Sequence, residues 1–289
     1  MAPIQRKVFV NVDVRLQPPT NHNKARCSTD PFNNSSARVM ATSSADPSPD
    51  DELIPLIDHA NVACGFHAGD PLIMAETVKI CKQHGIAIGA HPGLPDIQGF
   101  GRREMKLSAE ELTALTRYQI GALKAFLDAE DVPLHHVKPH GVLYGMMYRD
   151  PEVCTPVFGL AGTHHEAVAK ELGLPFVAEL YGMHPYQTQA LVSSHHKLTV
   201  ITGDVKYTSS GTLVIDRKKK AWTPEETKAH IASQLNHSSV TAVTGETVEL
   251  PIGDHEVSLC CHSDSPGAVE IVQAARQMVD DFNKSRNYV

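Results

Sequence analysis

The sequence predicts an α/β fold of parallel strands. Short apolar, β-branched runs alternate with longer amphipathic patterns, and this spacing is typical of strand–helix–strand units with a parallel sheet. The number of short buried runs favours a closed barrel over a sandwich. The candidate strands are Val8–Asp13, Ala60–Gly65, Ile86–Ala90, His136–Pro139, Val157–Leu160, Phe176–Leu180 and Val257–Cys261.

An open, doubly wound sheet is the alternative architecture. Such a sheet usually carries a glycine-rich phosphate turn after its first strand. Here the first strand runs into Asp13-Val14-Arg15-Leu16, which lacks that turn. The barrel is therefore the preferred prediction, as a single domain over residues 1–289.

The helices between the strands are predicted from their end signals. Asp70-Pro71 is an N-cap followed by a first-turn proline, and His84-Gly85 ends the same helix. Ser108-Ala109-Glu110-Glu111 is a capping box that opens a helix reaching about Ala129. Two further helices are expected at Thr163–Leu172 and from Pro266 to about Lys284.

Two segments do not follow the strand–helix pattern. Residues 15–51 are rich in Asn, Ser, Pro, Thr and Asp without periodicity, so disorder is expected there. Residues 182–203 separate the sixth candidate strand from Asp204, and loops of this length are uncommon within a compact domain. We interpret both as insertions, the second being either a lid or a tolerated surface loop.

Composition excludes several classes of protein. The net charge of −7 argues against nucleic-acid binding, and the basic run Arg217–Lys220 is expected to be a solvated turn. The six cysteines form no Cys-x-x-Cys pair, which favours free thiols in a reducing compartment. The chain shows no signal peptide and no membrane-length apolar stretch. A soluble cytoplasmic protein is expected.

Ionisable side chains lie at the ends of six predicted strands. In a parallel barrel the carboxyl ends of the strands form one rim, where the active site lies. Buried charges need partners, so packing alone does not explain such a set. The ionisable residues at these strand ends are Asp13, His67, Asp70, His91, His136, Lys138, His140, Glu179, His262 and Asp264.

These residue types suit acid–base catalysis. Histidine titrates near neutral pH and transfers protons, while carboxylates orient it, act as bases or bind a cation. Lys138 supplies a positive charge for a carboxylate, a phosphate or an oxyanion. Asp70 has a second explanation, because it is also a helix cap.

Metal binding and nucleophilic catalysis receive less support from the sequence. The histidines and Asp13 offer nitrogen and oxygen ligands for a divalent ion, but no tight motif such as His-Glu-x-x-His occurs, so we assign no metal. No Gly-x-Ser-x-Gly elbow is present either. Cys64 lies within an apolar strand and is predicted to be a core thiol.

At these residues the sequence resembles the LamB/YcsF family, whose members include one of the subunits of 5-oxoprolinase. The likeness covers roughly residues 1–13, 52–181 and 204–286. The matching blocks are HANVACGFHAGDP (59–71), GAHPGLPDIQGFGRR (89–103), YQIGALKAFL (118–127), HVKPHGVLYG (136–145), FGLAG (158–162) and HSDSP (262–266).

The resemblance implies a seven-stranded (β/α) barrel of the glycoside hydrolase/deacetylase type. It also implies ATP-dependent opening of 5-oxo-L-proline to L-glutamate, with partner subunits that perform the ATP-dependent step. The site residues that it carries over are Asp13, His67, Asp70, His91, Lys138, His140, Glu179, Asp204, His262 and Asp264.

The chain departs from the family pattern at three places. Arg15-Leu16 replace a Gly-Glu pair, residues 182–203 separate Glu179 from Asp204, and only Arg149–Pro156 remain of a helix. One hypothesis is that 15–51 and 182–203 are translated intron sequence and that exon sequence is skipped near residue 150.

Two alternative functions stay open from the sequence. One is a metal-dependent deacetylase or carbohydrate hydrolase on the same barrel. Stoichiometric Zn²⁺ or Mn²⁺ on His67, His91 and His262 would favour it. The other is a catalytically degraded homologue that only binds a ligand.

Overall fold

The computed structural model describes residues 7–14, 50–149, 176–178 and 197–288, except 215, 217, 218, 251 and 253–255. Several predicted features lie outside these residues. They are the strand at 157–160, the helix at 163–172, Glu179, residues 15–49 and residues 182–196.

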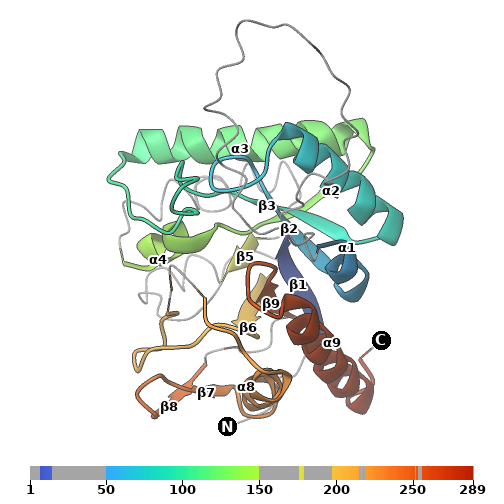
Figure 1. Cartoon of the computed structure of the whole chain (residues 1–289), viewed down its shortest axis with the longest axis vertical. Helices are drawn as coiled ribbons and strands as arrows, with labels where there is room; N and C mark the ends of the chain where they lie inside the picture. Colours follow the sequence, from blue (N-terminus) through green and yellow to red (C-terminus); the bar gives the residue numbers. More distant parts are fainter. Residues whose placement is uncertain are drawn as a thin grey trace, which may run out of the picture.

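A parallel sheet forms the centre of the molecule (Figure 1). Each strand pairs with the next in the order β1-β2-β3-β4-β5-β6-β9, and β9 pairs with β1, so the sheet is closed. The α/β class and the parallel arrangement are confirmed. The strands are β1 Val8–Val14, β2 His59–Ala63, β3 Ala87–His91, β4 Leu134–Val137, β5 Phe176–Ala178, β6 Lys197–Thr202 and β9 Glu256–His262.

Strand β6 corrects one interpretation from the sequence. Its residues 197–202 pair with β5 and β9, so the end of segment 182–203 is part of the sheet and not an inserted loop. The physical reason is visible in the sequence: Leu-Thr-Val-Ile-Thr is a β-branched run, and Val200 and Ile201 are fully buried. The strand leads directly to Asp204.

The helices that the sequence predicts are present at α2 Pro71–His84, α3 Ala109–Ala129 and α9 Ala268–Ser285. Asp70 caps α2, and Gly85 ends it in the left-handed conformation with a φ of 68°. The capping box at Ser108 is also observed.

Other elements were not predicted. They are α1 Asp50–Leu53, the 3-10 turn η2 Ile54–Leu56, α4 Gly141–Arg149, α8 Pro224–His237, and the antiparallel pair β7 Ser239–Thr241 and β8 Thr247–Glu249. Helix α1 begins at Asp50, inside the segment 15–51 for which disorder was expected. Helix α8 has its own capping box, from Thr223 to Glu226.

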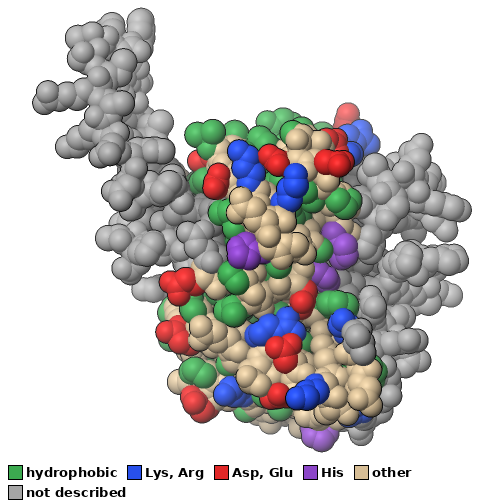
Figure 2. Space-filling view, turned by 90° about the vertical axis from the view of Figure 1, so that its right-hand side faces the viewer, with side chains coloured by type: hydrophobic (Ala, Val, Ile, Leu, Met, Phe, Trp, Pro, Cys, Tyr) green, Lys and Arg blue, Asp and Glu red, His purple; other side chains and the backbone are tan. Residues whose placement is uncertain are grey.

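The core lies between the sheet and the surrounding helices. Asn283 of α9 fastens this helix to the first strand, because its side chain accepts from the Val8 amide at 3.0 Å and donates to the Val8 carbonyl at 2.8 Å. The cysteines among the described residues are free and buried. No helix in the described part of the chain has the length and hydropathy to cross a membrane. Acidic and basic side chains are interspersed on the face shown in Figure 2.

Candidate active site

The strand ends meet around the carboxylate of Asp13. Lys138 Nζ, beyond β4, lies 2.8 Å from Oδ1 of Asp13. His91 Nε2, from β3, and His262 Nε2, from β9, lie 3.2 and 3.4 Å from Oδ2. Four predicted site residues, from four strands, therefore form one cluster.

Asn61 of β2 holds Asp13 from inside the barrel. Its Nδ2 donates to Oδ1 of Asp13 at 2.8 Å, and its Oδ1 lies 2.6 Å from Nε2 of His136. Burial disfavours the charged form of Asp13, but the charges of His91 and Lys138 outweigh it, and the pKa of Asp13 lies well below its ordinary value. Asp13 is therefore an ionised carboxylate whose side chain is only 12% exposed.

Three histidines form the neighbouring part of the site. His91 Nε2 lies 2.9 Å from His140 Nδ1, and the His67 ring is stacked on His140 with centroids 3.8 Å apart and planes within 3°. All three side chains are buried. Burial lowers the pKa of His91 and of His140, and the nearby Asp13 carboxylate opposes this shift in both rings.

Asp204 lies behind His262. Its Oδ1 is 2.7 Å from Nδ1 of His262, and Ser265 donates to its other oxygen. The pKa of Asp204 is lowered because the charges of His262 and Lys219 outweigh the effect of burial. This is a histidine–carboxylate pair that fixes the orientation of the His262 ring.

Asp264 is held by two cations. Arg102 Nη2 lies 2.7 Å from Oδ2, and Lys219 Nζ lies 3.2 Å from Oδ1. Burial raises the pKa of Asp264, but the charges of Lys219 and Arg102 outweigh this effect and lower the pKa to about 2. Since both oxygens are paired with cations, we interpret Asp264 as a structural anion of the site.

Lys219 corrects the prediction that the basic run 217–220 is a solvated turn. Its side chain is only 12% exposed, and its Nζ reaches Asp204 at 3.5 Å as well as Asp264. The turn prediction fails here because two buried carboxylates need a counter-charge, which a distant part of the chain supplies. Arg217 and Lys218 lie outside the described residues.

One predicted site residue, Asp70, is not part of this cluster, and a second, Glu179, is not among the described residues. Asp70 is exposed, and its Oδ1 accepts hydrogen bonds from the amides of Leu72 and Ile73 at 2.8 and 2.9 Å. Capping α2 therefore accounts for its position. Glu179 lies outside the described residues, so its membership of the site stays a prediction.

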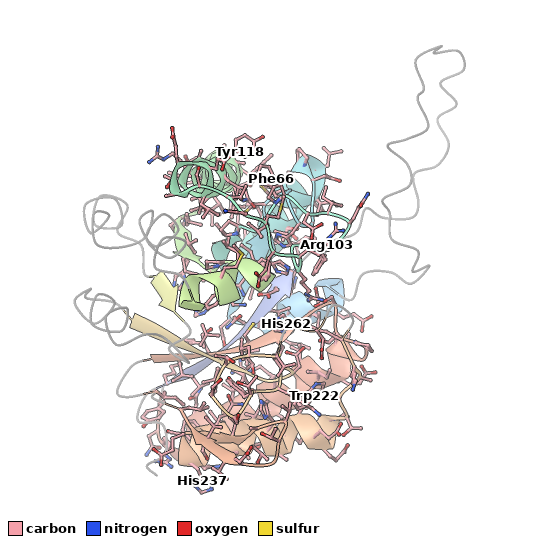
Figure 3. All side chains as sticks on the ribbon, turned by 90° about the vertical axis from the view of Figure 1, so that its left-hand side faces the viewer. Phe66, Arg103, Tyr118, Trp222, His237 and His262 are labelled. Carbon is pink, nitrogen blue, oxygen red and sulfur yellow. The ribbon has the colours of Figure 1, made fainter. Side chains whose placement is uncertain are left out.

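A cavity of about 360 Å³ opens onto the cluster. Its lining includes Tyr144, Leu213 and Trp222 as well as Asp13. Figure 3 shows His262 near the middle of the molecule and Trp222 below it. The residues from the cluster that line this cavity are Asp13, His91, Arg102, Lys138, His140, Asp204, Lys219 and His262.

The fold and the site define an α/β protein with a buried acid–base cluster at the carboxyl ends of parallel strands. The chain belongs to the LamB/YcsF family, whose family model matches residues 41–287. The resemblance inferred from the sequence blocks is thereby confirmed.

Individual relatives agree with this membership. The chain is 58% identical over 250 residues to the Lactam utilization protein lamB of Emericella nidulans, covering 83% of this chain and 90% of that protein. It is 38% identical over 246 residues to a 5-oxoprolinase subunit of Thermus thermophilus, covering 80% and 88%. The crystal structure of the Lactam Utilization Protein from Thermus thermophilus superimposes with a TM-score of 0.69 at 34% identity, covering 95% and 96%.

Proposed function

We propose that this chain hydrolyses the ring amide of a small lactam, 5-oxo-L-proline, to give L-glutamate. The names of its relatives, which refer to lactam utilization and to 5-oxoprolinase, support this proposal. The observation that carries it is the cluster of Asp13 with Lys138, His91 and His262 in the lining of a cavity sized for a small molecule.

The reaction needs ATP in this proposal because the carbonyl of a lactam is a poor electrophile. Transfer of the terminal phosphoryl group of ATP to the amide oxygen releases ADP and makes the ring carbon attackable by water. The ring C–N bond then breaks and phosphate leaves, which gives L-glutamate. We propose that partner subunits perform this ATP-dependent step, because the name of the Thermus thermophilus relative describes it as a subunit. We also propose that the protein acts in the cytoplasm and that its closed sheet is a barrel of the glycoside hydrolase/deacetylase type.

Each residue of the site has its own role in the hydrolytic step. Lys138 is buried, and its ammonium is directed at Asp13. In this position its positive charge stabilises the negative charge that develops on the oxygen of the ring carbon when water attacks. Asp13, His91 and His262 face one another and activate the water. Asp204 keeps the His262 ring in one orientation.

The outer part of the cavity suits the carboxylate of 5-oxoproline. Lys206 and Lys220 line it and are exposed, whereas Arg102 and Lys219 are paired with the carboxylate of Asp264. We therefore assign the substrate carboxylate to Lys206 and Lys220.

A turnover assay tests this function. The purified chain is added, with 5-oxoproline and ATP, to an extract of source cells that lack its gene, and released glutamate is measured. We expect glutamate release that requires both the chain and ATP, and none with the Lys138→Met variant. Binding of 5-oxoproline without turnover, alone and in the extract, would instead support a ligand-binding homologue.

A further inference from the structure

Phe100, in the loop that follows β3, has a backbone conformation that is unusual for its residue type. Its φ is 55°, in the left-handed region that favours glycine. In the described part of the chain, the other non-glycine residues with a positive φ are Asp131, Ser238 and Asn287, which all have short polar side chains. A bulky residue is a clear outlier in this region and stays there only where the surrounding structure enforces it.

Hydrogen bonds on both sides of Phe100 enforce this conformation. Asp96 accepts from the amide of Gly99 through its side chain and from the amide of Gly101 through its carbonyl, both at 2.9 Å. Arg103, labelled in Figure 3, donates from Nε to the Asp96 carboxylate at 3.0 Å. The loop is therefore tied to itself immediately before and after Phe100.

Phe100 contacts His140 through both its backbone and its ring. Its carbonyl oxygen, which can only accept, lies 2.8 Å from Nε2 of His140, so this nitrogen donates. Its ring stands nearly perpendicular to the stacked rings of His140 and His67, at 85° and 82°, with centroids 4.9 and 5.6 Å apart. A side chain on the next residue, Gly101, would lie 2.9 Å from atoms of both histidines, so the backbone also approaches them closely.

The other nitrogen of His140 faces the catalytic cluster. Its Nδ1 lies 2.9 Å from Nε2 of His91, which in turn lies 3.2 Å from Oδ2 of Asp13. Phe100 itself is not among the residues that line the cavity of about 360 Å³. We propose that Phe100 is a positioning residue, which fixes His140, and through it His91, in the orientation that the activation of water at Asp13 requires.

The ring explains why a strained phenylalanine stands where glycine would fit. A glycine at position 100 would adopt this φ without strain and would still supply the carbonyl. It would not supply the ring that stands against His67 and His140. The same ring lies under the guanidinium of Arg102, with Cζ 4.9 Å from the centroid, and Arg102 binds Asp264. Phe100 therefore contacts two parts of the site at once.

The inference rests on the proposed function, and two measurements on the full chain keep the two apart. In the turnover assay, Phe100→Gly should lower kcat for 5-oxoproline about tenfold with little change in KM, because the reacting groups lose their alignment. Phe100→Tyr, which keeps an aromatic ring, should restore most of this loss. The control is Asp131→Gly, at an exposed left-handed position after α3 with a φ of 53°, which should match the wild type.

The second measurement needs neither lactam nor ATP. NMR of the chain with isotopically labelled histidine follows the Nε2 hydrogen of His140, whose signal is assigned by its loss in His140→Gln. We expect this hydrogen to exchange with solvent about tenfold faster in Phe100→Gly, because the contact that covers it opens more often. In Asp131→Gly it should exchange at the wild-type rate.

The outcomes separate the proposal from its alternatives. Unchanged exchange in Phe100→Gly would overturn it, and so would faster exchange with an unchanged kcat. A raised KM at unchanged kcat would assign Phe100 to substrate binding and overturn the positioning role. Faster exchange in Phe100→Gly, combined with no lactam turnover by the wild type, would leave Phe100 as the residue that holds His140 and would count against the proposed function.

Discussion

Asp13 is the residue on which the cluster depends, because one of its oxygens faces a cation and the other faces histidines. Replacing Asp13 with Asn keeps the shape of the side chain but leaves the buried Lys138 ammonium without its counter-charge. We expect Asp13→Asn to lower the free energy of unfolding by about 3 kcal/mol, as measured by urea denaturation. Adding Lys138→Met should recover part of this loss, and a double variant less stable than the single one would contradict the assignment.

Lys220 gives a test of substrate recognition at the scale of one residue. It lines the outer cavity and is exposed, so removing its charge should weaken binding of an anionic substrate with little effect on the fold. We expect Lys220→Ala to raise KM for 5-oxoproline roughly tenfold with little change in kcat. The exposed Lys228→Ala variant on α8 is the control. Equal KM values for both variants would place the carboxylate elsewhere.

Most residues at the centre of the cluster were predictable from strand ends, and others were not. Asp13, His91 and His262 each lie at the end of a strand that the sequence shows clearly. Asn61 lies in the middle of β2, and only its polarity within an apolar run could have indicated its role. Lys219 follows no strand, and its contacts depend on how a distant turn folds back.

Among the elements, α2 begins at a residue, Asp70, that is both a predicted site residue and the cap of the helix. Asp70 accepts from two first-turn amides, and capping accounts for these contacts. We expect Asp70→Ala to lower the free energy of unfolding by about 1 kcal/mol and Asp70→Ser to restore most of it, with lactam turnover unchanged in both. Thermal denaturation and the turnover assay measure the two effects. A large loss of turnover at unchanged stability would return Asp70 to the active site.

Strand β6 shows why element prediction failed at one place. Its pattern is an ordinary buried strand, but it stands where a direct link from Glu179 to Asp204 was expected, so the whole segment was assigned to an insertion. The pairing of Val200 with Ser258 and of Thr202 with Cys260 shows that it belongs to the sheet. Helices with clear caps, such as α2 and α3, were predicted to within a residue because their end signals are local.

For the whole molecule, buried neutral histidines make stability depend on pH. Burial lowers the pKa of His59 to about 4, and that of His230 to about 4. Because both values lie below that of the unfolded chain, about 6.5, this contribution is fully present above pH 6.5 and is lost as the pH falls towards 4. Each histidine contributes at most about 3 kcal/mol.

Urea denaturation between about pH 7 and about pH 4.5 measures this dependence. We expect the free energy of unfolding to fall across the range, and His59→Gln to flatten the slope. His237→Gln, at an exposed position, should leave the slope unchanged. A wild-type chain equally stable at both ends of the range would show that these histidines are not neutral in the folded state.

The central claim concerns the whole molecule: the strand ends, far apart in the sequence, form one catalytic site. The most direct test measures glutamate release from 5-oxoproline and ATP by the wild type, Asp13→Ala and His140→Ala, with Asp70→Ala as the control. Loss of turnover in the first two variants, with the fold and the binding of partner subunits retained, is the predicted result. Full turnover by both Asp13→Ala and His140→Ala would contradict the account.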